Sequence, residues 1–144
     1  RTFSSAASDV YKRQDFYIAV FNCEIVLPIR DLEGVWLAKG TAIKNAKLKG
    51  AHLRLPGYQN EGPTLEIFQY GTAEEAPEAV ANRVGFGHIA FLVDDVKDMQ
   101  QKVVENGGKV LGEIVEHPVE DAGLLTFTYA KDPDGNILEL QKWT

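Results

Sequence analysis

The chain has the size and composition of a small globular protein with a single core. Its 144 residues are 44% hydrophobic and 25% charged, which is too little sequence for two ordinary independent domains. No apolar run approaches the roughly 20 residues of a membrane helix, and the formal net charge of -6 disfavours binding to phosphate backbones. Because Cys23 is the single cysteine, no internal disulfide can form. These features favour a cytoplasmic protein with neither nucleic-acid nor membrane partners.

The first half of the chain predicts a short helix followed by three strands. Apolar residues in 15–21 have helical spacing, and the apolar run 24–29 follows after a turn. Residues 46–55 and 63–70 alternate between polar and apolar, as half-buried strands do. Residues 34–44 are less regular, although Trp36 and Leu37 within them indicate a packed segment.

The second half predicts a strand, a helix and three further strands. Asp94 and Asp95 can cap the helix, and a glycine pair after Asn106 can end it. Asp132-Pro-Asp-Gly135 is a tight-turn sequence between the last two strands. The predicted strands cover residues 86–93, 109–116, 124–130 and 136–143, and the helix runs to about residue 105.

The two halves read as an internal repeat separated by an exposed linker at residues 71–84. Each half ends in a strand with a glutamate between two aliphatic residues, Leu65-Glu66-Ile67 in the first half and Leu138-Glu139-Leu140 in the second. We therefore predict an α+β fold of two βαβββ modules, 15–70 and 85–143, with antiparallel-dominated mixed sheets that form a cupped site. The opening strand of the first module is missing from this pattern.

Residues 1–14 are interpreted as non-native. The string from Ser4 to Gln14 resembles the conceptual translation of a transposon-end adapter used in DNA sequencing. Such a segment is excluded from fold reasoning as a tag would be. The native domain is therefore expected to cover residues 15–143.

Three side chains are candidates for metal chemistry because strand alternation assigns each of them a face. Leu65 and Ile67 predict a helix-covered face, which leaves Glu66 on the opposite side of its strand. The same reasoning places His88 and Glu139 away from the helix. Two carboxylates and one imidazole suit Zn, Ni, Co, Mn or Fe. Taken singly, a glutamate on a strand more often lies on a solvated face, and a lone histidine is more often structural, so only the combination points to a metal.

Two strings, residues 85–96 and 132–140, resemble the glyoxalase, bleomycin-resistance and dioxygenase superfamily, the vicinal oxygen chelate proteins. The resemblance implies a divalent metal bound by Glu66, His88 and Glu139. The fourth ligand position would fall near Phe3, inside the segment interpreted as non-native. It holds no residue of ligand type, so the site is expected to be incomplete.

Glutamate at both module ends makes the pattern most similar to glyoxalase I, a lyase or isomerase. That resemblance implies a small metabolite or thiol adduct as substrate, a metal-bound enediolate, and Glu66 or Glu139 as the proton acceptor. It also implies a homodimer for an intact protein. Alternatives are an epimerase of the methylmalonyl-CoA type, a dioxygenase, or a metal-free binding protein of the bleomycin-resistance type.

A substrate-binding role is predicted for His52, Arg54 and Phe68. His52 and Arg54 share a strand face, and Phe68 shares a face with Glu66. If that face is the concave one, Arg54 could bind a carboxylate or phosphate group. A solvated arginine at the end of a strand is an equally good interpretation.

Overall fold

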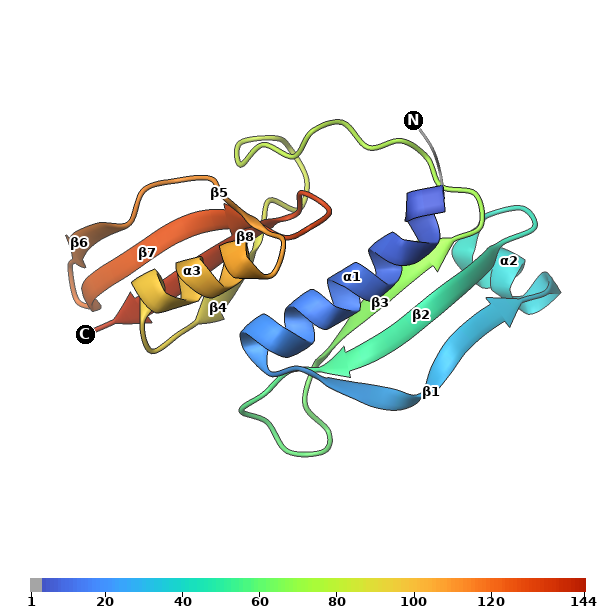
Figure 1. Cartoon of the computed structure of the whole chain (residues 1–144), viewed down its shortest axis with the longest axis horizontal. Helices are drawn as coiled ribbons and strands as arrows, with labels where there is room; N and C mark the ends of the chain where they lie inside the picture. Colours follow the sequence, from blue (N-terminus) through green and yellow to red (C-terminus); the bar gives the residue numbers. More distant parts are fainter. Residues whose placement is uncertain (1–3) are drawn as a thin grey trace. The chain divides into compact units, whose positions relative to one another are not determined.

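The computed structural model describes residues 4–144 and divides the chain into two compact units between Glu75 and Ala76. The division falls within residues 71–84, where the linker is predicted. Each unit contains its own sheet with a helix lying across one face (Figure 1). Antiparallel pairing dominates both sheets, which confirms the predicted α+β class.

The first unit is a helix on a three-stranded antiparallel sheet. Helix α1 (Ser4–Phe21) precedes strands β1 (Glu24–Glu33), β2 (Lys47–Arg54) and β3 (Thr64–Tyr70), which lie in the order β1-β2-β3. A short helix, α2 (Val35–Thr41), connects β1 to β2. The described residues begin with α1, so the absence of an opening strand stays a prediction.

Helix α1 begins at Ser4 rather than at Asp15, the predicted start. Residues 4–14 contain no glycine or proline that would end a helix. Val10 and Gln14 are buried on the face that also carries Tyr17 and Phe21. The interpretation of residues 1–14 as non-native stays a prediction, because packing carries no information about the origin of a sequence.

The core of the first unit lies mainly between α1 and the sheet. Ala51 and Leu53 of β2 and Ile67 of β3 are buried on the face that α1 covers. On the opposite face, Leu37 of α2 packs with Leu48. The irregular segment predicted at 34–44 is therefore partly helical, and Leu37 is the residue that anchors it.

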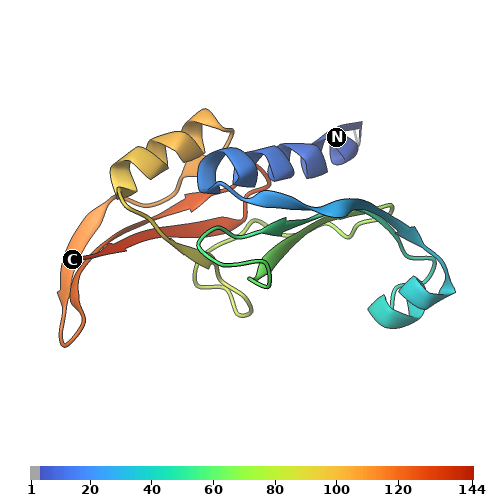
Figure 2. The same cartoon turned by 90° about the horizontal axis from the view of Figure 1, so that it is seen from below.

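The second unit is a mixed sheet covered on one face by α3 (Figure 2). Its strands are β4 (Ile89–Leu92), β5 (Lys109–Val110), β6 (Val115–Val119), β7 (Gly123–Lys131) and β8 (Ile137–Trp143), with α3 (Val96–Glu105) after β4. They lie in the order β4-β8-β7-β5, and β6 also pairs with β7. The β4–β8 pair is parallel and the other pairs are antiparallel.

The strand predicted at 109–116 is divided into β5 and β6. The amide groups of Leu111 and Gly112 both donate to the carbonyl oxygen of Tyr129, at 3.1 and 3.0 Å. Two residues therefore face one residue of β7, which interrupts the ladder as a β-bulge does.

Helix α3 begins with a side-chain cap that the sequence predicts. The Asp95 carboxylate accepts a hydrogen bond from the backbone amide of Asp98 at 2.9 Å. We expect Asp95→Ala to lower the free energy of unfolding of this unit by about 1 kcal/mol, because one helix amide loses its acceptor. Urea denaturation followed by circular dichroism measures the change. Asp94→Ala is the control, and an equal loss in both variants would contradict a capping role.

Candidate functional site

In the first unit, His52 and Glu66 form a pair on the sheet face opposite α1. The two residues are directly opposite in the β2–β3 register, and His52 Nε2 lies 3.2 Å from Glu66 Oε1. The His52 ring also lies against the Phe68 ring, with centroids 5.6 Å apart. Three residues predicted separately from the sequence, two for substrate and one for metal, are therefore neighbours.

Arg54 lies on the same face as His52 and already has an anionic neighbour. Its guanidinium Nη1 is 3.8 Å from Oε2 of Glu24, the opposite residue on β1. The Glu24 side chain is 77% exposed, so this ion pair contributes little to stability and is easily exchanged. Binding of a substrate anion by Arg54 stays a prediction, and such an anion would compete with Glu24 for the guanidinium group.

In the second unit, His88 and Glu139 form the corresponding pair. Glu139 is opposite Ala90 in the parallel β4–β8 register, and His88 precedes β4. His88 Nε2 lies 3.1 Å from Glu139 Oε1, and the Glu139 side chain is only 12% exposed. Leu138 and Leu140 are fully buried on the other face, as the alternation predicts.

Further side chains fix the orientation of Glu139. Gln141 Nε2 donates to Glu139 Oε2 at 2.6 Å, and Gln141 Oε1 accepts from Trp143 Nε1 at 2.7 Å. Because the indole is only a donor, it determines which end of the Gln141 amide faces the carboxylate. Gln141 and Trp143 were not predicted, although their spacing from Glu139 along β8 puts all three on one face.

Tyr129 is a second residue that sequence reasoning missed. Its ring centroid lies 4.7 Å from that of His88, and Tyr129 is opposite Glu139 in the β7–β8 register. Burial, and to a smaller extent the charge of Glu139, raise the pKa of Tyr129 above its ordinary value. The phenol therefore stays protonated at neutral pH. Strand β7 carries no pattern that would single out this tyrosine.

The donor atoms of each pair fit two neighbouring ligands of one divalent ion. Ligands with bonds of about 2.1 Å, at angles of roughly 90–110°, lie about 3.0–3.4 Å apart. Both imidazole–carboxylate distances fall in this interval. In the part of the chain that the structure describes, no group of three or more His, Cys, Asp or Glu side chains forms a metal site. Convergence of Glu66 with His88 and Glu139 stays a prediction, and Phe3 lies outside the described residues.

A family model for the Glyoxalase/Bleomycin resistance protein/Dioxygenase superfamily matches residues 3–140. The chain belongs to this superfamily. A probable lactoylglutathione lyase from Synechocystis sp. is 39% identical over 56 residues, which cover 39% of this chain and 40% of that protein. The match thus spans less than half of this curated relative. Among residues 4–144, no helix is both long and apolar enough to cross a membrane.

Solved structures of the superfamily share the fold. A glyoxalase family protein from Bacillus cereus has a TM-score of 0.71 at 19% identity, covering 90% of this chain and 85% of that one. A glyoxalase I mutant from Zea mays has a TM-score of 0.58 at 27% identity, with 92% and 40% covered. The fosfomycin resistance protein FosX from Listeria monocytogenes has a TM-score of 0.52 at 21% identity, with 94% and 85% covered. Relatives below 25% identity support the fold alone.

Proposed function

We propose that this chain is a metal-dependent lyase or isomerase of the glyoxalase I type that acts on a small metabolite or thiol adduct. The observation that carries the proposal is the His88–Glu139 pair, with 3.1 Å between two atoms of metal-ligand type. The partial match to a probable lactoylglutathione lyase supports the reaction class. The homodimer implied by the family pattern stays a prediction.

We assign His88 and Glu139 as metal ligands and add Glu66 from the family pattern. A divalent ion such as Zn, Ni, Co, Mn or Fe would supply a Lewis acid for neighbouring substrate oxygens. A carboxylate that faces the substrate can move a proton at the substrate carbon next to these oxygens. Glu139 suits this role because Gln141 holds its Oε2 and burial excludes competing water. Glu66, whose side chain is 58% exposed, is the second candidate for the base.

The main rival is a metal-free binding protein of the bleomycin-resistance type. An apolar cavity beside Tyr129, described below, favours this rival. The carboxylate of Glu139, whose side chain is 12% exposed, favours the metal, because a carboxylate that is largely withdrawn from water gains most from a cation beside it. Metal binding therefore separates the two functions.

Calorimetric titration with Zn²⁺ or Ni²⁺ tests the assignment. We expect His88→Ala, which removes a donor, and Glu139→Gln, which replaces a charged donor by a neutral one, each to weaken metal affinity at least about tenfold. His117→Ala removes an exposed imidazole from β6 and is the matched control. A parallel loss in Glu66→Gln would support the third ligand. Unchanged metal affinity in His88→Ala would exclude the proposed site.

A further inference from the structure

A cavity of about 460 Å³ lies within the second unit, on the same sheet face as Glu139. Three alternate residues of β7, Phe127, Tyr129 and Lys131, form its floor. Its walls come from residues 78–81, residues 111–113 and Val115. The volume is within the range of small-molecule sites, and its lining is mainly apolar.

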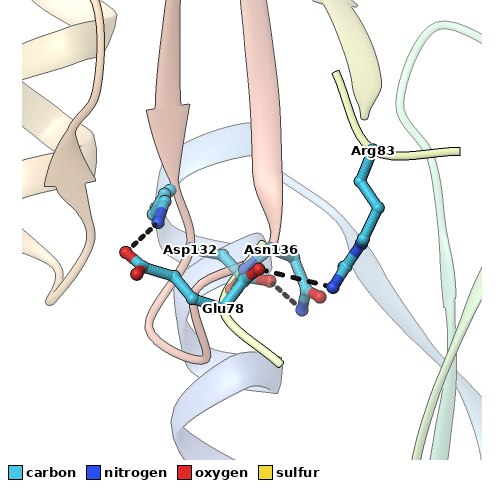
Figure 3. Close-up of polar contacts among 5 residues, drawn as sticks. Glu78, Arg83, Asp132 and Asn136 are labelled. Carbon is cyan, nitrogen blue, oxygen red and sulfur yellow. Dashed lines mark hydrogen bonds and ion pairs between the residues drawn. The ribbon is translucent and has the colours of Figure 1, made fainter. Parts of the chain in front are cut away.

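Lys131 brings a charge into this cavity. Its side chain is only 13% exposed, and its Nζ lies 3.4 Å from Oε1 of Glu78 (Figure 3). A nearby anion stabilises an ammonium group on a side chain with so little exposure, because partial burial removes part of its hydration. The anion present is weakly held, since the Glu78 side chain is 83% exposed. A ligand carboxylate can therefore replace it without leaving Lys131 unpaired.

Backbone contacts shape the surroundings of Lys131 independently of the Glu78 carboxylate. Arg83 Nη1 donates to the Glu78 carbonyl oxygen at 3.3 Å (Figure 3), and the Arg83 backbone amide donates to the Val80 carbonyl oxygen at 3.3 Å. On the other side, Asp132 accepts bonds from the Asp134 and Asn136 amides, both at 2.9 Å, in the turn after β7. None of these hydrogen bonds involves the Glu78 carboxylate, so they can persist when that side chain moves.

We propose that this cavity binds a small carboxylate with an apolar body. The carboxylate takes the place of Glu78 at Lys131, and the apolar body lies against Tyr129 and Phe127. Lys131 and Tyr129 are two residues apart on β7, so roughly 7 Å separates their Cα atoms and both side chains lie on one face. Tyr129 also contacts His88, and the far end of the ligand therefore lies beside the His88–Glu139 pair. The proposal does not depend on a bound metal.

Phenylacetate and its neutral analogue phenylacetamide test the charge requirement. Their affinities are measured by NMR titration of the full chain in EDTA, so the proposed metal site does not affect the result. We expect phenylacetate to bind more tightly than phenylacetamide. Lys131→Met should weaken phenylacetate about tenfold and leave phenylacetamide unchanged, because it removes only the charged contact. Lys97→Met on α3 is the matched control.

Substitution of Glu78 is expected to raise the affinity for phenylacetate, whereas substitution of Lys131 is expected to lower it. Glu78→Gln should strengthen phenylacetate binding about threefold, because the competing carboxylate is gone. Glu113→Gln removes the same charge from the same cavity without breaking an ion pair to Lys131, and should change the affinity less. If Glu78→Gln gives no gain, or if both ligands bind wild type equally, the proposal is wrong. Because Glu78 is exposed, its variant decides the question even if Lys131→Met fails to fold.

Discussion

In a chain whose site is completed by a His, Gln or Glu at the fourth ligand position, Glu139→Gln should lower turnover of the methylglyoxal–glutathione hemithioacetal at least about 100-fold, while bound metal falls less steeply. Glutamine keeps the shape of the side chain and one ligand oxygen. It loses the negative charge and cannot accept the substrate proton. In the structure, Glu139 Oε1 faces His88, and Gln141 holds Oε2. The measurements are thioester formation by absorbance and metal content by elemental analysis, both after loading with Zn²⁺ or Ni²⁺.

Glu116→Gln is the matched control for this experiment. Glu116 is an exposed carboxylate on β6 of the same unit, so its loss should change neither turnover nor metal content. If Glu139→Gln leaves turnover unchanged in the chain with the completed site, Glu139 is not the base, and Glu66 becomes the residue to test. If the chain with the completed site binds metal but shows no turnover, another reaction of the superfamily is indicated.

Gly50→Ala should destabilise the first unit by at least about 2 kcal/mol. Gly50 on β2 has φ 152°, in the region that favours glycine. A Cβ at this position would overlap the carbonyl oxygen of Ile67 and lie 2.9 Å from Cδ1 of Phe68. Strands β2 and β3 would have to separate, which would also disturb the pairing of His52 with Glu66. Urea denaturation followed by circular dichroism measures the loss.

Gly40→Ala is the same substitution in the same unit with the opposite expectation. Gly40 lies in α2, and a Cβ there would meet no atom within 4 Å. Stability should stay unchanged or rise by up to about 1 kcal/mol, because alanine is the better helix former. Equal destabilisation by both variants would show that the close approach of β2 and β3 at Gly50 is not what requires glycine.

Local patterns in the sequence were sufficient to predict most elements and the faces of the candidate residues. Alternation around Glu66 and Glu139 predicts that their neighbours pack toward a helix, and Ile67, Leu138 and Leu140 are buried as expected. Asp95 caps α3 as predicted. These features depend on residues close in sequence, where side-chain period and capping geometry leave few choices.

Helix and strand boundaries were predicted less accurately from the sequence, because tertiary contacts decide them. The start of α1 at Ser4 reflects burial of Val10 and Gln14, which no spacing within residues 15–21 could reveal. The division of residues 109–116 into two strands depends on two amide groups that share the Tyr129 carbonyl. Both are outcomes of pairing with distant segments.

The sequence by itself determined the superfamily, the class of fold and the residue types at the candidate site, because recurring strings and strand alternation are local properties. Only the tertiary structure decided which residues are neighbours. Strand pairing brings His52 beside Glu66 and His88 beside Glu139, and it places Tyr129 between that second pair and the cavity that contains Lys131. Register between strands arises from hydrogen bonds and packing over the whole sheet, so a single strand cannot specify its neighbours.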